Sequence, residues 1–126
     1  MDTKSLERNI KKILKTGSGY GPEFIPVLKQ TKVVLKSINR GIATAEKYFE
    51  LGELCLALED TGLALEAFKT GYQKNPEHVN CGCYYALLLE QQENITEALE
   101  VYLALNKIAP ENIMLVERML LIFYQQ

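Results

Sequence analysis

The fold of this chain is decided by residues 45–77, which read AEKYFELGELCLALEDTGLALEAFKTGYQKNPE. Shifted by 34 positions, they align with residues 79–111, VNCGCYYALLLEQQENITEALEVYLALNKIAPE, with seven identities among 33 positions. Ala64-Leu65-Glu66 returns as Ala98-Leu99-Glu100, and Pro76-Glu77 returns as Pro110-Glu111. Self-similarity at such a period is typical of proteins built from stacked repeats. We therefore expect a linear array of small units.

Each unit is predicted to form two helices. Residues 46–58 carry apolar side chains at spacings of three and four, which gives one stripe on a helix: Tyr48, Leu51, Cys55 and Leu58. A second helix is expected at 62–74, ended by Pro76, because the residue before proline avoids the helical conformation. The second unit repeats this pattern with helices at 79–92 and 96–108.

Turn and capping signals separate the two helices of each unit. Asp60-Thr61-Gly62 has the composition of a turn. In the second unit, Asn94 with Glu97 three residues later predicts a capping box at the start of the second helix.

The first unit resembles the tetratricopeptide repeat in residue type and spacing, through Tyr48, Leu51, Gly52, Ala64, Phe68, Gly71 and Pro76. The resemblance implies that Gly52 and Ala64 lie where the paired helices cross. The second unit departs from the pattern, since Gly82 replaces the aromatic, Ala86 the glycine and Leu105 a small residue. The resemblance covers residues 45–126. It implies an all-α, right-handed superhelix of antiparallel helix hairpins.

Residues 113–126 are expected to begin a third unit. The segment is apolar almost all round, whereas a terminal repeat helix normally shows water a polar face. We interpret it as an association surface, because large apolar patches mark interfaces: Met114, Leu115, Leu121, Ile122, Phe123 and Tyr124. A second copy, a partner or a fold-back of residues 1–41 could cover it. Burial within the monomer is the simpler alternative, and the sequence could also be a fragment of a longer array.

Residues 1–41 form a separate basic segment before the array units 45–78, 79–112 and 113–126. One amphipathic helix is expected at 4–16, followed by a flexible glycine-rich break at 17–21. A second helix is expected after Pro22, which suits a first helical turn. These two helices should pack against the first repeat as an N-terminal cap.

The charge distribution is uneven along the chain. Residues 1–41 hold nine Lys/Arg and three Asp/Glu, whereas residues 42–126 hold five and thirteen. The basic segment could contact nucleic acid or an anionic membrane. It could equally be neutralised by the acidic part of its own chain or of a second copy.

The sequence offers little chemistry. The glycine-rich stretch lacks the Gly-Lys-Ser/Thr of a phosphate loop. The spacing of Cys81 and Cys83 inside a helix turns their thiols roughly 200° apart, which does not suit zinc. His78, the single histidine, is expected at the surface or as a helix cap. We therefore predict no catalysis, no metal and no cofactor.

Compartment signals are also weak. The first residues lack the apolar run of a secretory signal, and no stretch reaches the ~18 apolar residues of a membrane span. Three cysteines without an export signal favour reduced thiols in the cytoplasm.

The family resemblance also implies where a partner binds. In such arrays the first helix of each pair lines the concave side. The two complete units contribute Glu46, Phe49, Glu53, Leu56, Asn80, Cys83, Leu87 and Glu90, and the unfinished third unit contributes Met114, Glu117, Leu121 and Tyr124. An apolar floor edged by carboxylates suits an amphipathic helix or extended peptide with basic residues. The acidic tails of heat-shock chaperones are not expected to bind this groove, because they carry the same charge as its carboxylates.

We therefore expect a protein-binding scaffold, adaptor or small chaperone, with self-association through 113–124. The alternative is a regulatory binder of nucleic acid or an anionic membrane surface that uses the basic helices at 4–40.

Overall fold

The structure is a computed structural model that describes residues 1–17 and 19–125, and every regular element within them is helical. The elements in chain order are α1 (Thr3–Thr16), the short 3-10 helix η1 (Pro22–Phe24), α2 (Ile25–Asn39), α3 (Ala45–Ala57), α4 (Thr61–Lys74), α5 (Val79–Gln91), α6 (Ile95–Ile108) and α7 (Ile113–Gln125). The predicted all-α class is confirmed. The five predicted helices of the array agree with the observed ones to within one residue at each end.

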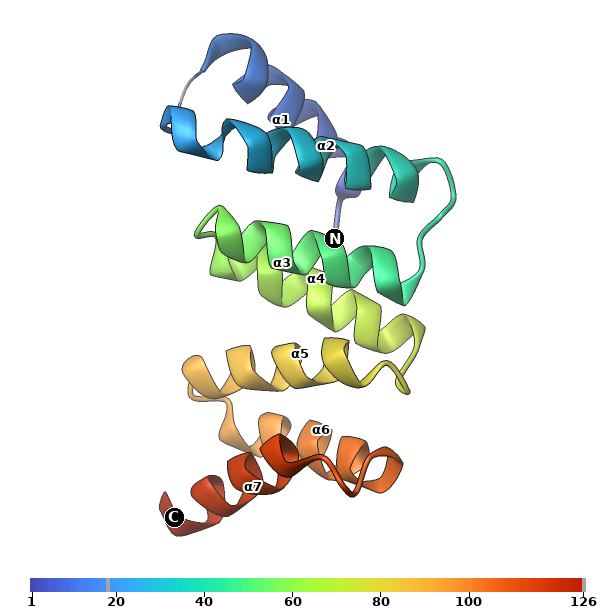
Figure 1. Cartoon of the computed structure of the whole chain (residues 1–126), viewed down its shortest axis with the longest axis vertical. Helices are drawn as coiled ribbons and strands as arrows, with labels where there is room; N and C mark the ends of the chain where they lie inside the picture. Colours follow the sequence, from blue (N-terminus) through green and yellow to red (C-terminus); the bar gives the residue numbers. More distant parts are fainter. Residues whose placement is uncertain (18, 126) are drawn as a thin grey trace.

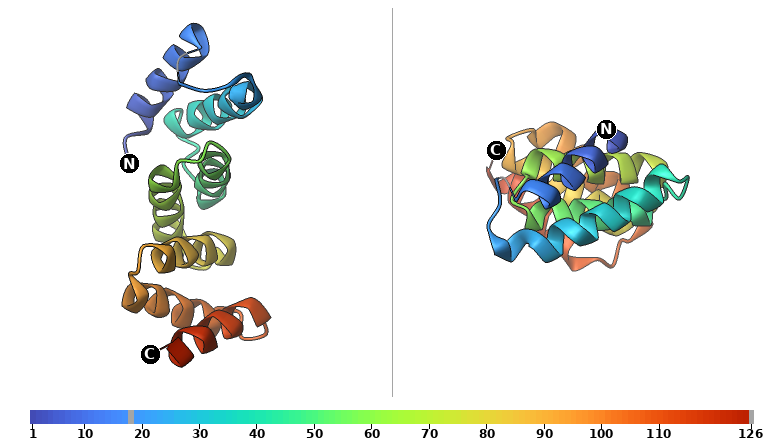
Figure 2. Two further views of the ribbon diagram at one scale, coloured as in Figure 1. Left: turned by 90° about the vertical axis from the view of Figure 1, so that its left-hand side faces the viewer. Right: turned by 90° about the horizontal axis from the view of Figure 1, so that it is seen from above.

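The helices form a stack in which each one packs on the next, with α1 at one end and α7 at the other (Figure 1). Successive helices run in alternating directions, as Figures 1 and 2 show. In addition, α3 contacts α5 across the intervening α4. The apolar core therefore runs along the stack as a continuous series of hairpin contacts.

The turn inside each repeat has the same backbone geometry in both copies. Glu59 and Glu93, 34 residues apart, both adopt the left-handed conformation, with φ of 62° and 64°. The next residue donates its N–H to the carbonyl of the residue five positions earlier, from Asp60 to Cys55 and from Asn94 to Leu89, at 2.9 Å each. The repeat thus extends to hydrogen bonds that the sequence did not reveal.

The predicted capping box at Asn94 and Glu97 is wrong. The side chain of Asn94 makes no capping hydrogen bond, and the carboxylate of Glu97 instead accepts from the Tyr85 hydroxyl at 3.0 Å. The first repeat does use a side-chain cap, because Asp60 accepts from the Leu63 N–H at 3.0 Å. The hydrogen bond from Tyr85 therefore engages the Glu97 carboxylate, which the local sequence had predicted as part of the cap.

The two helices of the first hairpin approach closely at Gly52. A Cβ atom at Gly52 would lie 2.5–2.8 Å from ring carbons of Phe68, which is too close for any side chain. Gly52, Ala64 and Phe68 are all buried. The small residues therefore serve the helix contact that the resemblance implied.

A second contact explains why the second repeat departs from the pattern. In the first repeat, the large Tyr48 faces Gly71, where an added Cβ would lie 3.2 Å from the Tyr48 Cβ. In the second repeat the equivalent pair is Gly82 and Leu105, and a Cβ on Gly82 would lie 2.7 Å from Leu105. The large and small residues have exchanged helices, so the space between the helices stays filled.

The N-terminal pair continues the stack. Four of the five buried residues of α2 match those of α4 at an offset of 33: Thr31, Val34, Leu35 and Ile38 correspond to Ala64, Ala67, Phe68 and Gly71. Asn39 ties α1 to α2, donating to Glu7 at 2.8 Å and accepting from the Thr3 hydroxyl at 2.6 Å. Of the predicted glycine-rich break, Gly17 ends α1 with φ of 70°, and Ser18 lies outside the described residues.

Replacing Gly52 with Ala should destabilise the protein by about 1–3 kcal/mol, because the new methyl group collides with the Phe68 ring. Gly62→Ala is the matched control, since its nearest neighbour lies at 3.7 Å, and should change stability by less than about 1 kcal/mol. Equilibrium urea unfolding measures both. Equal stabilities of the two variants would contradict the close-contact assignment.

Candidate functional site

The first helices of successive pairs share one side of the stack. Phe49 of α3 contacts Tyr84 of α5, with ring centroids 5.6 Å apart, and Glu90 of α5 forms an ion pair with Arg118 of α7. These two contacts connect the three helices, and we call the side they form the α3–α5–α7 face. Figure 2 shows the stack turned so that the succession of helix pairs is visible.

Seven of the eight residues predicted for the groove from the two complete units are not fully buried. Glu46, Glu53 and Asn80 are exposed, whereas Phe49, Leu56, Leu87 and Glu90 are partly buried. Cys83 is the exception, because it is buried in the core and a partner cannot reach it. Its assignment to the groove is therefore corrected: helical phase alone placed it there, whereas in the folded chain its side chain belongs to the apolar core.

An aromatic cluster lies at the α3 end of the face. Phe68 stacks on Tyr84 with centroids 4.9 Å apart, and Phe49 contacts both rings and also His78 at 5.5 Å. Sequence reasoning included Phe49 and missed Tyr84 and His78 as members of one cluster. Tyr84 follows the predicted Cys83 directly, so a small change in the assumed helical phase would have included it.

His78 has the capping role that its position predicted. Its Nδ1 accepts from the Cys81 N–H at 3.1 Å, at the start of α5, and its Nε2 lies 2.9 Å from the Glu46 carboxylate. These two partners fit the neutral ring with its proton on Nε2. The ring therefore connects α3 to α5 with both nitrogens engaged.

A cavity of about 340 Å³ opens between α5 and α7, lined by Leu87, Glu90, Gln91, Ile95, Arg118, Leu121, Ile122 and Gln125. It brings Leu87 and Glu90, predicted for the groove, next to Leu121, predicted for the association surface. The ion pair with Glu90 raises the pKa of the Arg118 guanidinium. The Glu90 side chain is only 9% exposed, so this carboxylate serves mainly to hold α7.

The junction of α5, α6 and α7 is polar. Glu90 Oε1, Arg118 Nε and the Tyr102 hydroxyl are buried there without a hydrogen bond to described protein atoms. Burial raises the pKa of Tyr102, so this phenol stays protonated. The attachment of α7 thus combines this polar junction with apolar contacts of its buried residues Leu115, Met119 and Ile122.

The predicted association surface divides into two parts. Leu115 and Ile122 are buried against the rest of the stack, so they hold α7 in place and are not accessible to a partner. Met114 is partly buried, whereas Leu121, Phe123 and Tyr124 are exposed. The monomer therefore buries one stripe of α7 and leaves a second apolar stripe open.

The basic residues of α1 lie on one side of the helix. Lys4, Arg8, Lys11, Lys12 and Lys15 are all exposed and follow each other at helical spacing. Lys11 pairs with Glu7 at 3.0 Å. The outer face of α1 is thus a cationic strip at the end of the stack opposite α7.

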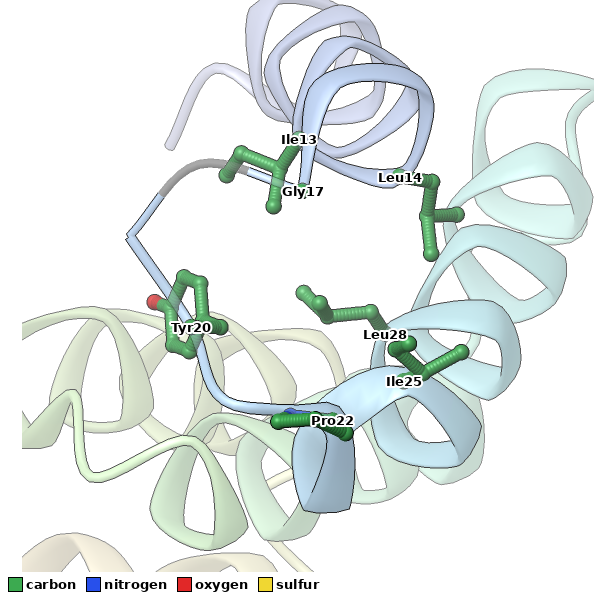
Figure 3. A pocket seen from close by; sticks show the side chains of 7 residues that line it. All are labelled: Ile13, Leu14, Gly17, Tyr20, Pro22, Ile25 and Leu28. Carbon is green, nitrogen blue, oxygen red and sulfur yellow. The ribbon is translucent and has the colours of Figure 1, made fainter.

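An apolar cavity of about 320 Å³ lies between α1 and α2 (Figure 3). Figure 3 shows its lining: Ile13, Leu14, Gly17, Tyr20, Pro22, Ile25 and Leu28. Binding sites for small molecules usually combine an apolar wall with a few converging polar groups. Apart from the Tyr20 hydroxyl this lining offers no polar side chain, so it has little means of orienting a ligand.

The three cysteines are free and buried. Desolvation raises the pKa of Cys55 and of Cys81 to about 12, and that of Cys83 to about 11. Within residues 1–17 and 19–125, no group of three His, Cys, Asp or Glu side chains is placed to hold a metal ion. No helix in those ranges has the length and apolar character needed to cross a membrane.

No protein-family model matches the chain, and no curated protein matches its sequence. The resemblance to the tetratricopeptide repeat therefore stays a prediction from the sequence.

At pH 8 the three thiols should react with an aromatic disulfide reagent at least about a hundredfold more slowly than in unfolded protein. With a pKa of about 11 to 12, only about one thiol in a thousand or fewer is ionised, and burial adds a steric barrier. Absorbance of the released thiol measures the rate with and without denaturant. Rapid labelling of one cysteine in folded protein would show that its helix opens readily.

Proposed function

We propose that this protein is a binding module of the tetratricopeptide-repeat type, which holds an amphipathic, basic segment of another protein. The binding site is the α3–α5–α7 face. One observation carries the proposal: accessible apolar side chains follow one another along three successive first helices, bordered by exposed carboxylates.

The floor of this site is apolar. Phe49 and Tyr84 form its α3 end, and Leu87 with Leu121 continues it along the cavity between α5 and α7. A helix or extended peptide would place apolar side chains at regular intervals along such a floor. Burial of each large apolar side chain contributes about 1.5–3 kcal/mol, which is enough to anchor a segment.

The borders of the site are acidic. Glu46 and Glu53 are exposed on α3, and the cation of α7, Arg118, is already paired with Glu90. Basic residues on the partner would therefore find complementary charge, whereas an acidic tail would meet repulsion. The charge supports binding of a basic segment and sets its orientation more than its affinity.

Binding fits the chemistry of the chain better than catalysis does. The single histidine uses both ring nitrogens in contacts that join α3 to α5, and the three thiols are buried with raised pKa. Free cysteines suit a reducing compartment, so we place the protein in the cytoplasm. A scaffold or small chaperone is the role that this combination suits.

Charge reversal tests the site. Peptides selected from a library of amphipathic basic sequences should bind Glu53→Lys about two- to fivefold more weakly than the unmodified protein, since an exposed ion pair contributes up to about 1 kcal/mol. Glu66→Lys, an exposed substitution on α4, is the matched control and should bind normally. Fluorescence anisotropy at low and moderate salt measures both.

Leu87→Asp adds an independent test, because it places a charge on the apolar floor. If folded Leu87→Asp and Glu53→Lys both bind the peptide as tightly as the unmodified protein, the binding site lies elsewhere. Binding of an acidic tail peptide would contradict the proposed charge preference.

The cationic strip of α1 supports a second candidate, the binding of nucleic acid or an anionic membrane surface. Its five basic side chains are exposed on one side of a terminal helix. Such binding would depend mainly on electrostatic contacts with phosphate groups.

If this second function operates, affinity for a DNA duplex or for phosphatidylserine vesicles should fall steeply with salt. Replacing Lys11, Lys12 and Lys15 with Gln should abolish it, whereas the same change at Lys69, Lys74 and Lys107 should not. Absence of binding to either probe at low salt would eliminate the second candidate.

A further inference from the structure

Helix α7 leaves one apolar stripe open, at positions that are filled in the other two first helices. Ile113, Val116, Leu120 and Phe123 follow a spacing of three, four and three, and their side chains are 72%, 38%, 50% and 56% exposed. The equivalent residues of α3 are Ala45, Tyr48, Gly52 and Cys55, all buried. In α3 this stripe receives the second helix of the hairpin, so the stripe of α7 is a helix-binding surface by position.

The residues of the stripe restrict what can cover it. In the first hairpin Phe68 packs on Gly52, where even a methyl group would collide. The equivalent residue of α5 is the small Ala86, and the equivalent residue of α7 is Leu120. Leu120 fills the space that an aromatic residue of a covering helix would need. A helix like α4 or α6 therefore does not fit, whereas a helix with aliphatic side chains and a wider separation does.

The opposite end of the stack does not provide such a helix. The outer face of α1 carries Lys4, Arg8, Lys11, Lys12 and Lys15, which an apolar stripe would desolvate without compensation. Head-to-tail association of copies is therefore disfavoured. The other helices expose fewer large aliphatic residues: Ile25 and Val33 on α2 are eight positions apart, and Leu103 and Ile108 on α6 are five apart, so neither pair continues a stripe at spacings of three and four.

The stripe is complementary to itself. Because its spacing reads the same in both directions, an antiparallel copy of α7 would place Ile113 opposite the partner's Phe123 and Val116 opposite the partner's Leu120. None of the four stripe residues is charged, and exposed Glu117 borders the stripe, four positions after Ile113 and three before Leu120. Antiparallel helix dipoles favour the arrangement. We propose that the protein forms a two-fold symmetric dimer in which the α7 stripes of two copies pack antiparallel.

The size of the surface sets the expected strength. A 13-residue helix is about 20 Å long, so the contact falls at or below the roughly 1,200 Å² at which standard interfaces begin. We expect a reversible dimer in the micromolar range. The surface is separate from the α3–α5–α7 face, so the proposal does not depend on the proposed function.

Sedimentation velocity over a range of concentrations tests the dimer. The full chain should shift from one copy to two, and Leu120→Glu should weaken the dimer at least about tenfold, because it places a charge at the centre of the stripe. Val33→Glu is the matched control, since Val33 is 53% exposed on α2, and should leave the dimer unchanged. Circular dichroism checks that both variants remain helical.

Cross-linking tests the orientation without a disruptive charge. A mixture of Ile113→Cys and Phe123→Cys proteins, treated with a short bismaleimide, should give more cross-linked dimer than either protein alone. The native cysteines are buried and should contribute little. A monomer at every concentration, a dimer that Leu120→Glu leaves intact, or cross-links mainly between identical positions would overturn the proposal.

Discussion

The close approach of paired helices at small residues is the constraint on which the rest of the structure depends. Gly52 allows the Phe68 ring to lie against the α3 backbone, and no larger residue leaves room for it. Because this contact sets the distance between α3 and α4, it also sets which side chains of α3 remain accessible. The α3–α5–α7 face consists of those side chains of the first helices that are buried neither by the hairpin contact nor by the preceding helix.

The same constraint is met differently in the second hairpin. The first hairpin has Tyr48 against Gly71, and the second has Gly82 against Leu105. The combined volume of the two side chains is therefore similar, although the size at each position has changed. A repeat defined by residue type at single positions looks degraded at α5, whereas the packing between α5 and α6 is intact. Close-packed interiors constrain the volume of a contact more strongly than the identity of either member.

The two ends of the stack are chemically opposite, and this difference organises the proposed functions. The α1 end carries exposed cations, the α7 end carries an open apolar stripe, and the acidic face lies between them. The ion pair of Glu90 with Arg118 holds α7 where its buried stripe packs on the stack and its open stripe points away. One helix can therefore contribute to the cavity beside α5 and to a separate surface.

The sequence by itself determined the all-helical class, the 34-residue period and the helix bounds, because apolar spacing and proline positions act locally. Seven of the eight residues that it assigned to the groove from the two complete units are at least partly exposed, since helical phase follows from the packing stripe. Only the tertiary structure decided that Cys83 is covered, that Glu97 contacts Tyr85 instead of capping α6, and that Leu115 and Ile122 face inward. Those outcomes depend on which neighbouring helix reaches a given side chain, and that depends on contacts between residues distant in the chain.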